Sequence, residues 1–414
     1  MVLSIREYEK LYIRELRDLN TKQISREDAI SLQNLIINDM PVFKWGNRCL
    51  IAQQWVGVID LPEYSIEILP KLANDSNVDE CRLVLTRMLL IAHQAPSIKN
   101  LHGSVKASKN SLTEVLIAAF LTALEYYLKN GMLSAYRKVE DDLDVVKGRI
   151  VFGKQFNKNA LTPIRFQCSF TKYIRDNPVN QFFATCLGEM NRISRDSDNL
   201  RRIRIIEASF DDITRLEVQK AINLKPVFNS INISAEQPYK LGYLFLSNYF
   251  MTLNAGNIEM NIMLFDMNHL FELFMFKVIQ LILGSKVRYQ NSGHYLVKDE
   301  KTLRKYIKLR PDIIVHGNEG RDYILDTKWK LPSVFAKESD IYQMNAYSSG
   351  IGTATKVFLI YPETSNSQSF TGDYEFISSE GTKRKLGIRA VNLGHCLSWS
   401  IFMSEVRLLF CDIY

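Results

Sequence analysis

The chain has 414 residues, of which 46% are hydrophobic and 23% charged, a composition that excludes a disordered, fibrous or collagen-like protein. Its 52 Lys and Arg against 45 Asp and Glu give a formal net charge of +7, which permits a polyanionic partner such as nucleic acid without requiring one. Because a domain usually takes roughly 100–200 residues, the length predicts two or three domains.

The first 160 residues predict a mixed region of strands and helices. Short apolar runs favour two strands, and apolar residues at helical spacing favour two helices after them. In chain order these elements are residues 56–61, 65–70, 78–93 and 111–131. Residues 145–152 favour a further strand, and a polar, Asn-rich stretch follows at 156–162. We therefore place a domain boundary between residues 160 and 161.

Residues 177–224 favour helices and carry a cluster of arginines. The cluster comprises Arg192, Arg195, Arg201, Arg202 and Arg204. Because Asp196 and Asp198 offset part of this charge, we interpret the cluster as a solvated helix face, with a phosphate-contacting surface as the alternative.

The last third predicts the element order α-β-β-β-α-β. Asp266 is placed to cap a helix that runs to about Leu283, and Gly284 lies just past its end. Three strands, a helix and a strand follow, at residues 286–289, 306–315, 323–330, 339–349 and 356–361.

Cysteine, histidine and hydropathy patterns exclude several classes of protein. The six cysteines and six histidines show no C-x-x-C or H-x-x-x-H spacing, so we expect neither a zinc site nor a disulfide framework. The most apolar stretches, 112–128 and 270–284, contain charged residues and fall short of the ~18–20 apolar residues of a membrane span. With no secretory segment at the N-terminus either, we expect a reduced, cytoplasmic protein without a membrane partner.

Residues 148–155 match most of the phosphate-binding loop pattern G-x-x-x-x-G-K. They lack its terminal Ser or Thr, whose hydroxyl binds Mg²⁺. The bulky Arg-Ile-Val-Phe interior also favours a strand over a loop that wraps a phosphate. We therefore expect no nucleotide to be bound by this chain.

Two carboxylates and a lysine lie on neighbouring predicted strands. Asp312 starts one apolar strand, and Asp326 and Lys328, two residues apart on the next, point to the same face. Charges within strands rich in Ile, Leu and Val are costly unless they are paired or bound to metal. The set predicts a Mg²⁺ site, with Mn²⁺ as an alternative ion, that hydrolyses phosphodiester bonds. Lys328 is placed to orient or deprotonate water, or to stabilise the phosphate in the transition state.

This Pro-Asp…Asp-x-Lys pattern resembles the PD-(D/E)xK nuclease superfamily, whose core has the same α-β-β-β-α-β order. The resemblance implies that Glu272, in the preceding helix, is a further acidic metal ligand. Gln343 and Tyr347 match the Q-x-x-x-Y element of the RecB-like branch, where we expect them to support the fold or contact DNA. The alternatives are a buried Asp312–Lys328 ion pair in a non-catalytic fold and an ordinary exposed Glu272.

Other segments resemble the McrC family, the nuclease subunits of McrBC-type modification-dependent restriction systems. The similar segments are residues 57–61, 65–71, 146–150, 176–181 and 325–330, within about 45–360. The chain departs from the family pattern at Lys147 and Gln181, where arginine is usual, so contacts with a partner can differ.

The resemblance implies a metal-dependent DNA endonuclease subunit that works with a separate McrB-like AAA+ GTPase hexamer. The GTPase recognises modified double-stranded DNA, and this chain docks on the ring and stimulates GTP hydrolysis. The expected fold class is an α+β or α/β multidomain protein. Residues 1–160 form a mixed β-rich and helical partner-docking domain, and residues 161–414 form a helical lead-in plus a restriction-endonuclease-like nuclease domain with its core at about 266–361.

A basic cluster lies just before Asp312 in the sequence. Its members, which we expect to contact DNA phosphates, are Lys301, Arg304, Lys305, Lys308 and Arg310. A solvated charged loop is the alternative. Two rival functions also stay open: an adaptor that activates a ring NTPase and cuts nothing, and a standalone PD-(D/E)xK nuclease.

Overall fold

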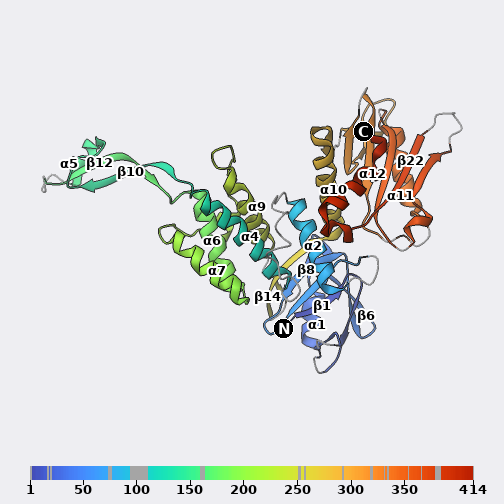
Figure 1. The fold of residues 1–414 in the computed structure, drawn as a ribbon, viewed down its shortest axis with the longest axis horizontal. Coiled ribbons are helices and arrows are strands. Elements are labelled where there is room, and N and C mark those ends of the chain that lie inside the picture. The colour runs from blue at the N-terminus through green and yellow to red at the C-terminus, as the bar shows by residue number, and fades with distance from the viewer. Residues whose placement is uncertain are drawn as a thin grey trace. The chain divides into compact units, whose positions relative to one another are not determined.

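The computed structural model describes residues 2–15, 18, 21–72, 77–93, 111–158, 164–249, 253–255, 258–290, 293–317, 320–330, 332, 335–352, 354–364, 366–377 and 384–413 (Figure 1). They form two compact units: unit 1, which comprises Met1–Val115 and Asn248–Tyr414, and unit 2, which comprises Leu116–Ser247. The predicted boundary between residues 160 and 161 lies within unit 2 and outside the described residues. On either side of it, β10 (Ala135–Leu143) and β12 (Phe166–Ile174) pair as one antiparallel ladder.

Unit 1 begins with a five-stranded mixed sheet in the order β1-β9-β8-β14-β13. The bounds are β1 Val2–Arg6, β8 Trp55–Asp60, β9 Ser65–Leu69, β13 Leu253–Ala255 and β14 Ile258–Asp266. The predicted strands at 56–61 and 65–70 are confirmed as β8 and β9, whose side chains are almost all buried. Helix α2 (Val78–Ala92) packs against β9, as the helical pattern at 78–93 predicted.

A second, four-stranded sheet and a short helix complete the N-terminal part of unit 1. The sheet has the order β3-β2-β7-β6, and a small hairpin, β4-β5, accompanies it. The bounds are β2 Lys10–Ile13, β3 Gln23–Ile24, α1 Arg26–Gln33, β4 Ile36–Ile37, β5 Met40–Pro41, β6 Phe43–Gly46 and β7 Cys49–Ala52. Apolar side chains from both sheets and α1 form one core, which makes this part mixed α/β as expected.

Gly57 is required where β8 pairs with β14. Its φ is +138°, and a Cβ built on it would lie 2.0 Å from the backbone oxygen of Met263. We expect Gly57→Ala to lower the free energy of unfolding by about 1–3 kcal/mol, because the two strands must separate to admit the methyl group. Tryptophan fluorescence during urea unfolding measures this in unit 1, where all four tryptophans lie. Gly352→Ala is the control, since no atom lies within 4 Å of its added Cβ; equal effects would contradict the explanation.

Unit 2 combines helices with a long antiparallel ribbon (Figure 1). The helices are α4 Leu112–Lys129, which starts in unit 1, α5 Phe152–Lys158, α6 Pro178–Ile193, α7 Ser197–Glu207, α8 Val218–Ile222 and α9 Glu236–Tyr249. The helical patterns at 111–131 and 177–224 are therefore confirmed. The predicted strand at 145–152 is wrong, because only β11 (Arg149–Ile150) pairs, with β12, and α5 begins at Phe152.

The remainder of unit 1 contains a six-stranded mixed sheet in the order β15-β18-β19-β20-β22-β21. The strands are β15 Val287–Tyr289, β18 Ile313–His316, β19 Asp322–Thr327, β20 Ala354–Pro362, β21 Gly372–Phe376 and β22 Arg384–Val391. Helices α10 (Met267–Leu283), α11 (Glu338–Gly350) and α12 (Trp399–Leu409) accompany it. The elements α10, β15, β18, β19, α11 and β20 reproduce the predicted α-β-β-β-α-β order.

The predicted strand at 306–315 is divided in two. β17 (Lys305–Leu309) pairs with β16 (His294–Lys298), a strand that the sequence analysis missed, as a separate two-stranded ribbon. β18 then starts at Ile313 in the large sheet. Pro311 lies between them and has no backbone N–H for a sheet ladder, which explains the interruption.

Helix α10 begins and ends where its sequence predicted. The Asp266 side chain accepts a hydrogen bond from the backbone N–H of Asn268, and Gly284 ends the helix with a φ of +65°. Among the described residues, Met267–Lys286 is the one helical segment long and apolar enough to span a membrane. Phe271 and Phe274 are nevertheless fully buried against Trp329 and Phe402, so α10 is a core helix of unit 1.

Candidate functional site

The predicted carboxylates and lysine meet in unit 1 at the ends of β18 and β19. Asp326 lies on β19 and is fully buried. Asp312 comes one residue before Ile313, which pairs with Leu325, so the two aspartates lie level on adjacent strands. Lys328 follows β19, and its Nζ lies 2.6 Å from Oδ2 of Asp326. The structure therefore brings Asp312, Asp326 and Lys328 together, as the pattern predicted.

Asp312 is held by the strand that carries Asp326. Its Oδ2 accepts hydrogen bonds from the backbone N of Thr327 at 2.7 Å and from Oγ1 of Thr327 at 3.0 Å. Burial, together with the negative charges of Asp326 and Glu272, raises the pKa of Asp312 to about 7. A cation placed beside Asp312 would favour the ionised carboxylate and lower its pKa.

Asp326 is tied to helix α11 through two predicted supporting residues. Gln343 Nε2 lies 3.4 Å from Oδ1 of Asp326 and donates to the Tyr347 hydroxyl at 2.7 Å. The Tyr347 hydroxyl in turn donates to the backbone oxygen of Arg310 at 2.9 Å, just ahead of Asp312. Gln343 and Tyr347 thus link both aspartates to one helix, a placement that suits a supporting role.

The contact between Lys328 and Asp326 is electrostatic. Oδ2 of Asp326 is buried and, despite the short distance to Lys328, receives no hydrogen bond of good geometry from a described residue. Burial raises the pKa of Asp326, and the charge of Lys328 opposes that rise. For Lys328 burial lowers the pKa, but the contacts with Asp326 outweigh it and raise the pKa above its usual value. Lys328 is therefore protonated at neutral pH, which favours orientation or charge stabilisation over deprotonation of water.

Glu272 faces the pair from α10. Its Oε1 accepts a hydrogen bond from Gln290 Nε2 at 2.8 Å, and its Oε2 lies 3.9 Å from Nδ1 of His269. Burial alone would raise the pKa of Glu272, but hydrogen bonds from His269, Gln290 and Tyr289 lower it overall. Within the described part of the chain, no three His, Cys, Asp or Glu side chains converge as a preformed metal site. The structure thus places Glu272 beside the aspartates without assembling a three-ligand cluster.

Glu7, directly after β1, also reaches this region. Trp329, directly after Lys328, donates its indole N–H to both carboxylate oxygens of Glu7 at 3.1 and 3.0 Å. Glu7 is 1% exposed and also accepts from the backbone N of Lys71. The pattern at 325–330 did not reveal this contact, because its two partners stand at opposite ends of the sequence.

Glu7 gives unit 1 a pH-dependent stability. Burial raises the pKa of Glu7 from 4.5 to about 8. Between these values the unfolded chain releases a proton that the folded chain keeps, so stability falls as the pH rises and levels off above about 8. We expect the thermal midpoint of the unchanged protein to fall relative to that of Glu7→Gln as the pH rises from 5 to 8, because glutamine does not titrate. Tryptophan fluorescence measures this, and a constant difference would contradict it.

The predicted DNA-contacting residues do not lie on the large sheet. Lys301, Arg304, Lys305 and Lys308 belong to the β16–β17 ribbon and its turn, and Arg310 follows it. All five are exposed, and the ribbon leads directly to Asp312. Of the arginine cluster in unit 2, Arg192 is 60% exposed and pairs with Glu189 of the same helix at 3.1 Å, as expected for a solvated helix face. Arg202 does not fit that interpretation, because its side chain is 23% exposed and bonds to Glu125 and Thr122 of α4 at 2.8 and 3.0 Å.

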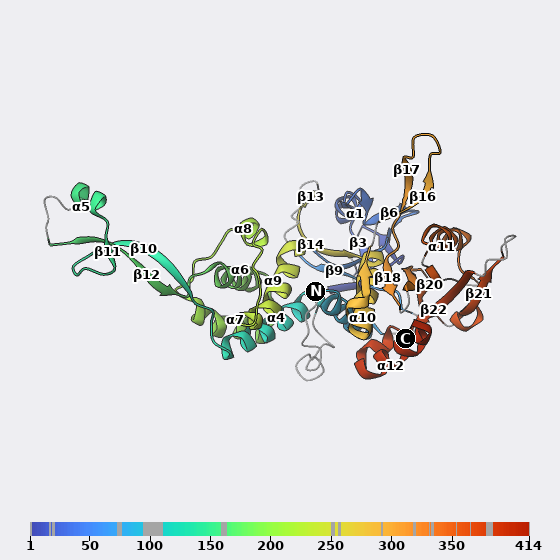
Figure 2. The same ribbon diagram turned by 90° about the horizontal axis from the view of Figure 1, so that it is seen from above.

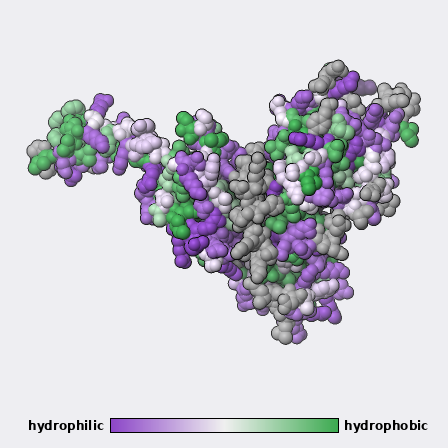
Figure 3. Space-filling model, viewed as in Figure 1, coloured by the Kyte–Doolittle hydropathy of each residue, from purple (hydrophilic) through white to green (hydrophobic). Residues whose placement is uncertain are grey.

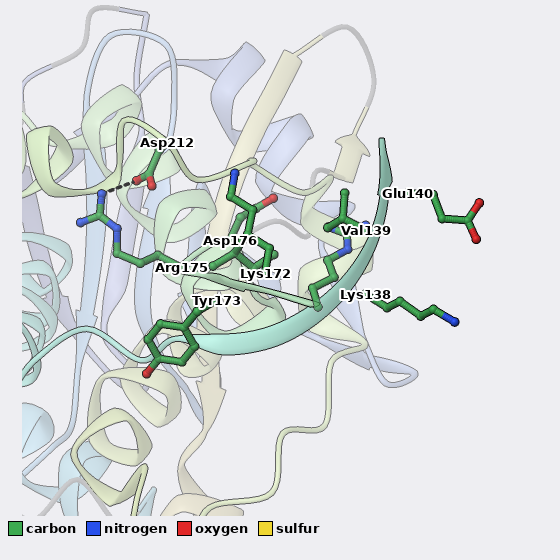
Figure 4. Close-up of a pocket in the computed structure, with 10 residues that line it drawn as sticks. Lys138, Val139, Glu140, Lys172, Tyr173, Arg175, Asp176 and Asp212 are labelled. Atoms are coloured by element: carbon green, nitrogen blue, oxygen red, sulfur yellow. Dashed lines mark ion pairs between the residues drawn. The ribbon is translucent and has the colours of Figure 1, made fainter. Parts of the chain in front are cut away.

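Unit 2 has a separate hollow of about 640 Å³ where the long ribbon meets the helices (Figure 4). Its charges are of both signs and partly paired, with Arg175 3.0 Å from Asp212. Gln181, which stands where the resemblance predicts arginine, donates a hydrogen bond to Asp176 at 2.8 Å. Asp176 is thus held by a neutral donor at this position, and we assign no ligand to the hollow.

The fold and site define a mixed α/β multidomain protein with a buried acid, a partly buried acid and a lysine at the strand ends of one sheet. The chain belongs to the McrBC 5-methylcytosine restriction system component family, whose model matches residues 50–362. This confirms the family predicted from the sequence segments. No curated protein matches the sequence.

Two solved structures support the same fold. A chain from a half-complex of Thermococcus gammatolerans McrB AAA+ hexamers with bound McrC superposes with a TM-score of 0.70 at 18% identity, covering 99% of this chain and 100% of that chain. A chain of the Thermococcus gammatolerans McrBC complex gives a TM-score of 0.52 at 20% identity, covering 67% of this chain and 87% of that one.

Proposed function

We propose that this protein is the DNA-cleaving subunit of a McrBC-type restriction complex and that it docks on an AAA+ GTPase ring. The observation that carries the cleavage proposal is the meeting of Asp312, Asp326 and Lys328 at the strand ends of one sheet. The family match and the resemblance to a chain solved with McrB hexamers support the ring partner. A pure adaptor has no need of a buried acid beside a partly buried one, since burial opposes the ionisation of both.

The residues present fit a divalent metal, Mg²⁺ first and Mn²⁺ second. Asp312 and Asp326 supply hard oxygen ligands, and the buried Oδ2 of Asp326 lacks a well-formed hydrogen bond among the described residues. A bound ion would lower the pKa of a water and neutralise charge on a phosphoryl oxygen. For Glu272 Oε1 to become a third ligand, a bond to the metal would have to replace the hydrogen bond that Oε1 now accepts from Gln290. The protonated Lys328 stabilises negative charge on the phosphate as the bond breaks.

The end of the long ribbon in unit 2 is the part of residues 1–160 that best fits a docking surface. Val145, Phe152, Phe156 and, beyond the predicted boundary, Ile164 are 64–75% exposed there, and hydrophobic side chains gather over α5 in Figure 3. Phe152 and Phe156 are four residues apart on α5 and so share a face. Clustered exposed apolar side chains commonly mark protein interfaces. We therefore assign them to the ring contact.

Docking through α5 has a direct test. We expect Phe152→Ser with Phe156→Ser to weaken binding to the ring by more than about tenfold and to abolish stimulation of GTP hydrolysis. Ile205→Ser, at a 65% exposed position on α7, is the matched control and should leave both unchanged. Unaltered stimulation by the double variant would move the docking surface elsewhere.

The overall function is tested by reconstitution. The protein is mixed with a McrB-like AAA+ protein, GTP or ATP, Mg²⁺, and methylated or unmethylated plasmid, and both cleavage and nucleotide hydrolysis are measured. We expect cleavage of modified DNA only when both proteins are present. Stimulated hydrolysis without any cutting would favour the adaptor, and robust cutting without the ring would favour a standalone nuclease.

A further inference from the structure

The two-stranded ribbon of β16 and β17, residues 294–309, stands clear of the large sheet (Figure 2). Its base is fixed to the fold. Leu309 is 5% exposed and packs so closely on α11 that a Cβ on Gly350 would lie 2.5 Å from Leu309 Cδ1. The ribbon therefore projects from a firm base, and only two residues separate it from Asp312.

The ribbon carries a surplus of positive charge. Its cations are Lys298, Lys301, Arg304, Lys305 and Lys308, all exposed, and none forms an ion pair with a described residue. Lys298 and Lys305 even stand directly opposite each other, an arrangement that destabilises a hairpin on its own. The ribbon's two acids, Asp299 and Glu300, offset only part of this charge, and the Asp299 carboxylate accepts hydrogen bonds from the backbone N–H groups of Lys301 and Thr302. Such a surface fits a polyanion.

Exposed apolar side chains are interleaved with these cations. Leu303 in the turn is 63% exposed, and Ile307 on β17 is 62% exposed. Both have left-handed backbones, with φ of +57° and +56°, which is unfavourable for Leu and more so for a β-branched residue. A two-stranded hairpin with exposed apolar groups and a strained backbone gains little stability in water. Strain of this kind is often found where a ligand is bound.

We propose that this ribbon enters the minor groove of the substrate duplex beside the scissile phosphate, an inference that rests on the proposed function. The cations contact phosphates on both sides of the groove, and Leu303 and Ile307 press against the base steps. Apolar side chains flanked by cations are the combination with which minor-groove proteins part base steps and bend DNA. The major groove also admits a two-stranded ribbon, but bases are read there mainly through hydrogen bonds with polar side chains, and Leu303 and Ile307 offer none.

The test uses the full chain with its ring partner and a duplex that contains 2-aminopurine, whose fluorescence rises when a base step opens. We expect Leu303→Ser with Ile307→Ser to abolish the rise and to slow cleavage at least tenfold, with an unchanged dependence of affinity on salt. Lys301→Gln with Lys305→Gln should flatten the log–log salt slope by about 2, since each lost phosphate contact accounts for about 0.9. Val227→Ser with Ile231→Ser, 82% and 85% exposed in unit 2, should behave as the unchanged protein.

The possible outcomes distinguish a failure of the ribbon's proposed role from a failure of the proposed nuclease activity. Wild-type fluorescence and cleavage in the Leu303→Ser, Ile307→Ser protein would overturn the insertion. Loss of ring stimulation in that protein, with intact DNA binding, would overturn it too and make the ring the ribbon's partner. Asp326→Asn should still open the base step without cutting. If the unchanged complex opens DNA but never cuts it, the proposed nuclease fails while the ribbon's role stands.

Discussion

Asp326→Asn is expected to reduce DNA cleavage on the order of 10³-fold while ring binding and stimulation of GTP hydrolysis stay intact. Asparagine keeps the shape of the side chain but removes the negative charge that would hold the metal and that pairs with Lys328. A metal contributes several kcal/mol of charge stabilisation, and each ~1.4 kcal/mol lost costs about tenfold in rate. Because Asp326 is 0% exposed, the change cannot act by direct contact with a partner.

The measurement is a single-turnover cleavage assay on the reconstituted complex, with nucleotide hydrolysis recorded in the same samples. Glu375→Gln, an exposed acid on β21 of the same sheet, is the matched control and should cut at the normal rate. Normal cutting by the Asp326→Asn protein would refute the site. Loss of both cutting and GTPase stimulation would instead indicate that the substitution disturbs the fold.

Local signals explain what the sequence predicted well. The capping Asp266 and the positive-φ Gly284 define both ends of α10 without reference to the rest of the chain. The centre of strand β19, residues 323–325, is apolar, and Asp326 directly follows it as a buried charge. Alternation along that strand was enough to place Asp326 and Lys328 on one side, and the β18–β19 hairpin added Asp312.

The failures have a common cause, which is that β-propensity does not specify a partner. Residues 145–152 are β-prone, yet only Arg149 and Ile150 find a neighbouring strand. β16 was missed because its five residues are at most half-buried and show no apolar alternation. The Glu7–Trp329 contact joins residues 322 positions apart, and no local pattern can reveal such a pair.

Arg82→Met is expected to destabilise unit 1 by about 3–5 kcal/mol, because it leaves a buried carboxylate without its counter-charge. Arg82 donates two hydrogen bonds of 2.7 Å to the carboxylate of Glu67, which is 0% exposed. When the arginine is lost, the bonds that Glu67 keeps from described residues are those from Ser4 Oγ and the backbone N of Leu112, both at 3.0 Å.

The control for this pair is Asp79→Asn. Asp79 contacts the same guanidinium at 2.8 Å but is 40% exposed, so its removal should cost less than about 1 kcal/mol. Urea unfolding followed by tryptophan fluorescence compares the variants in unit 1, where all four tryptophans lie. Equal losses would show that burial of Glu67 is not what makes Arg82 essential. A large loss for Arg82 alone would show that Glu67, which joins β1, α2 and the start of α4, requires its charge to be balanced.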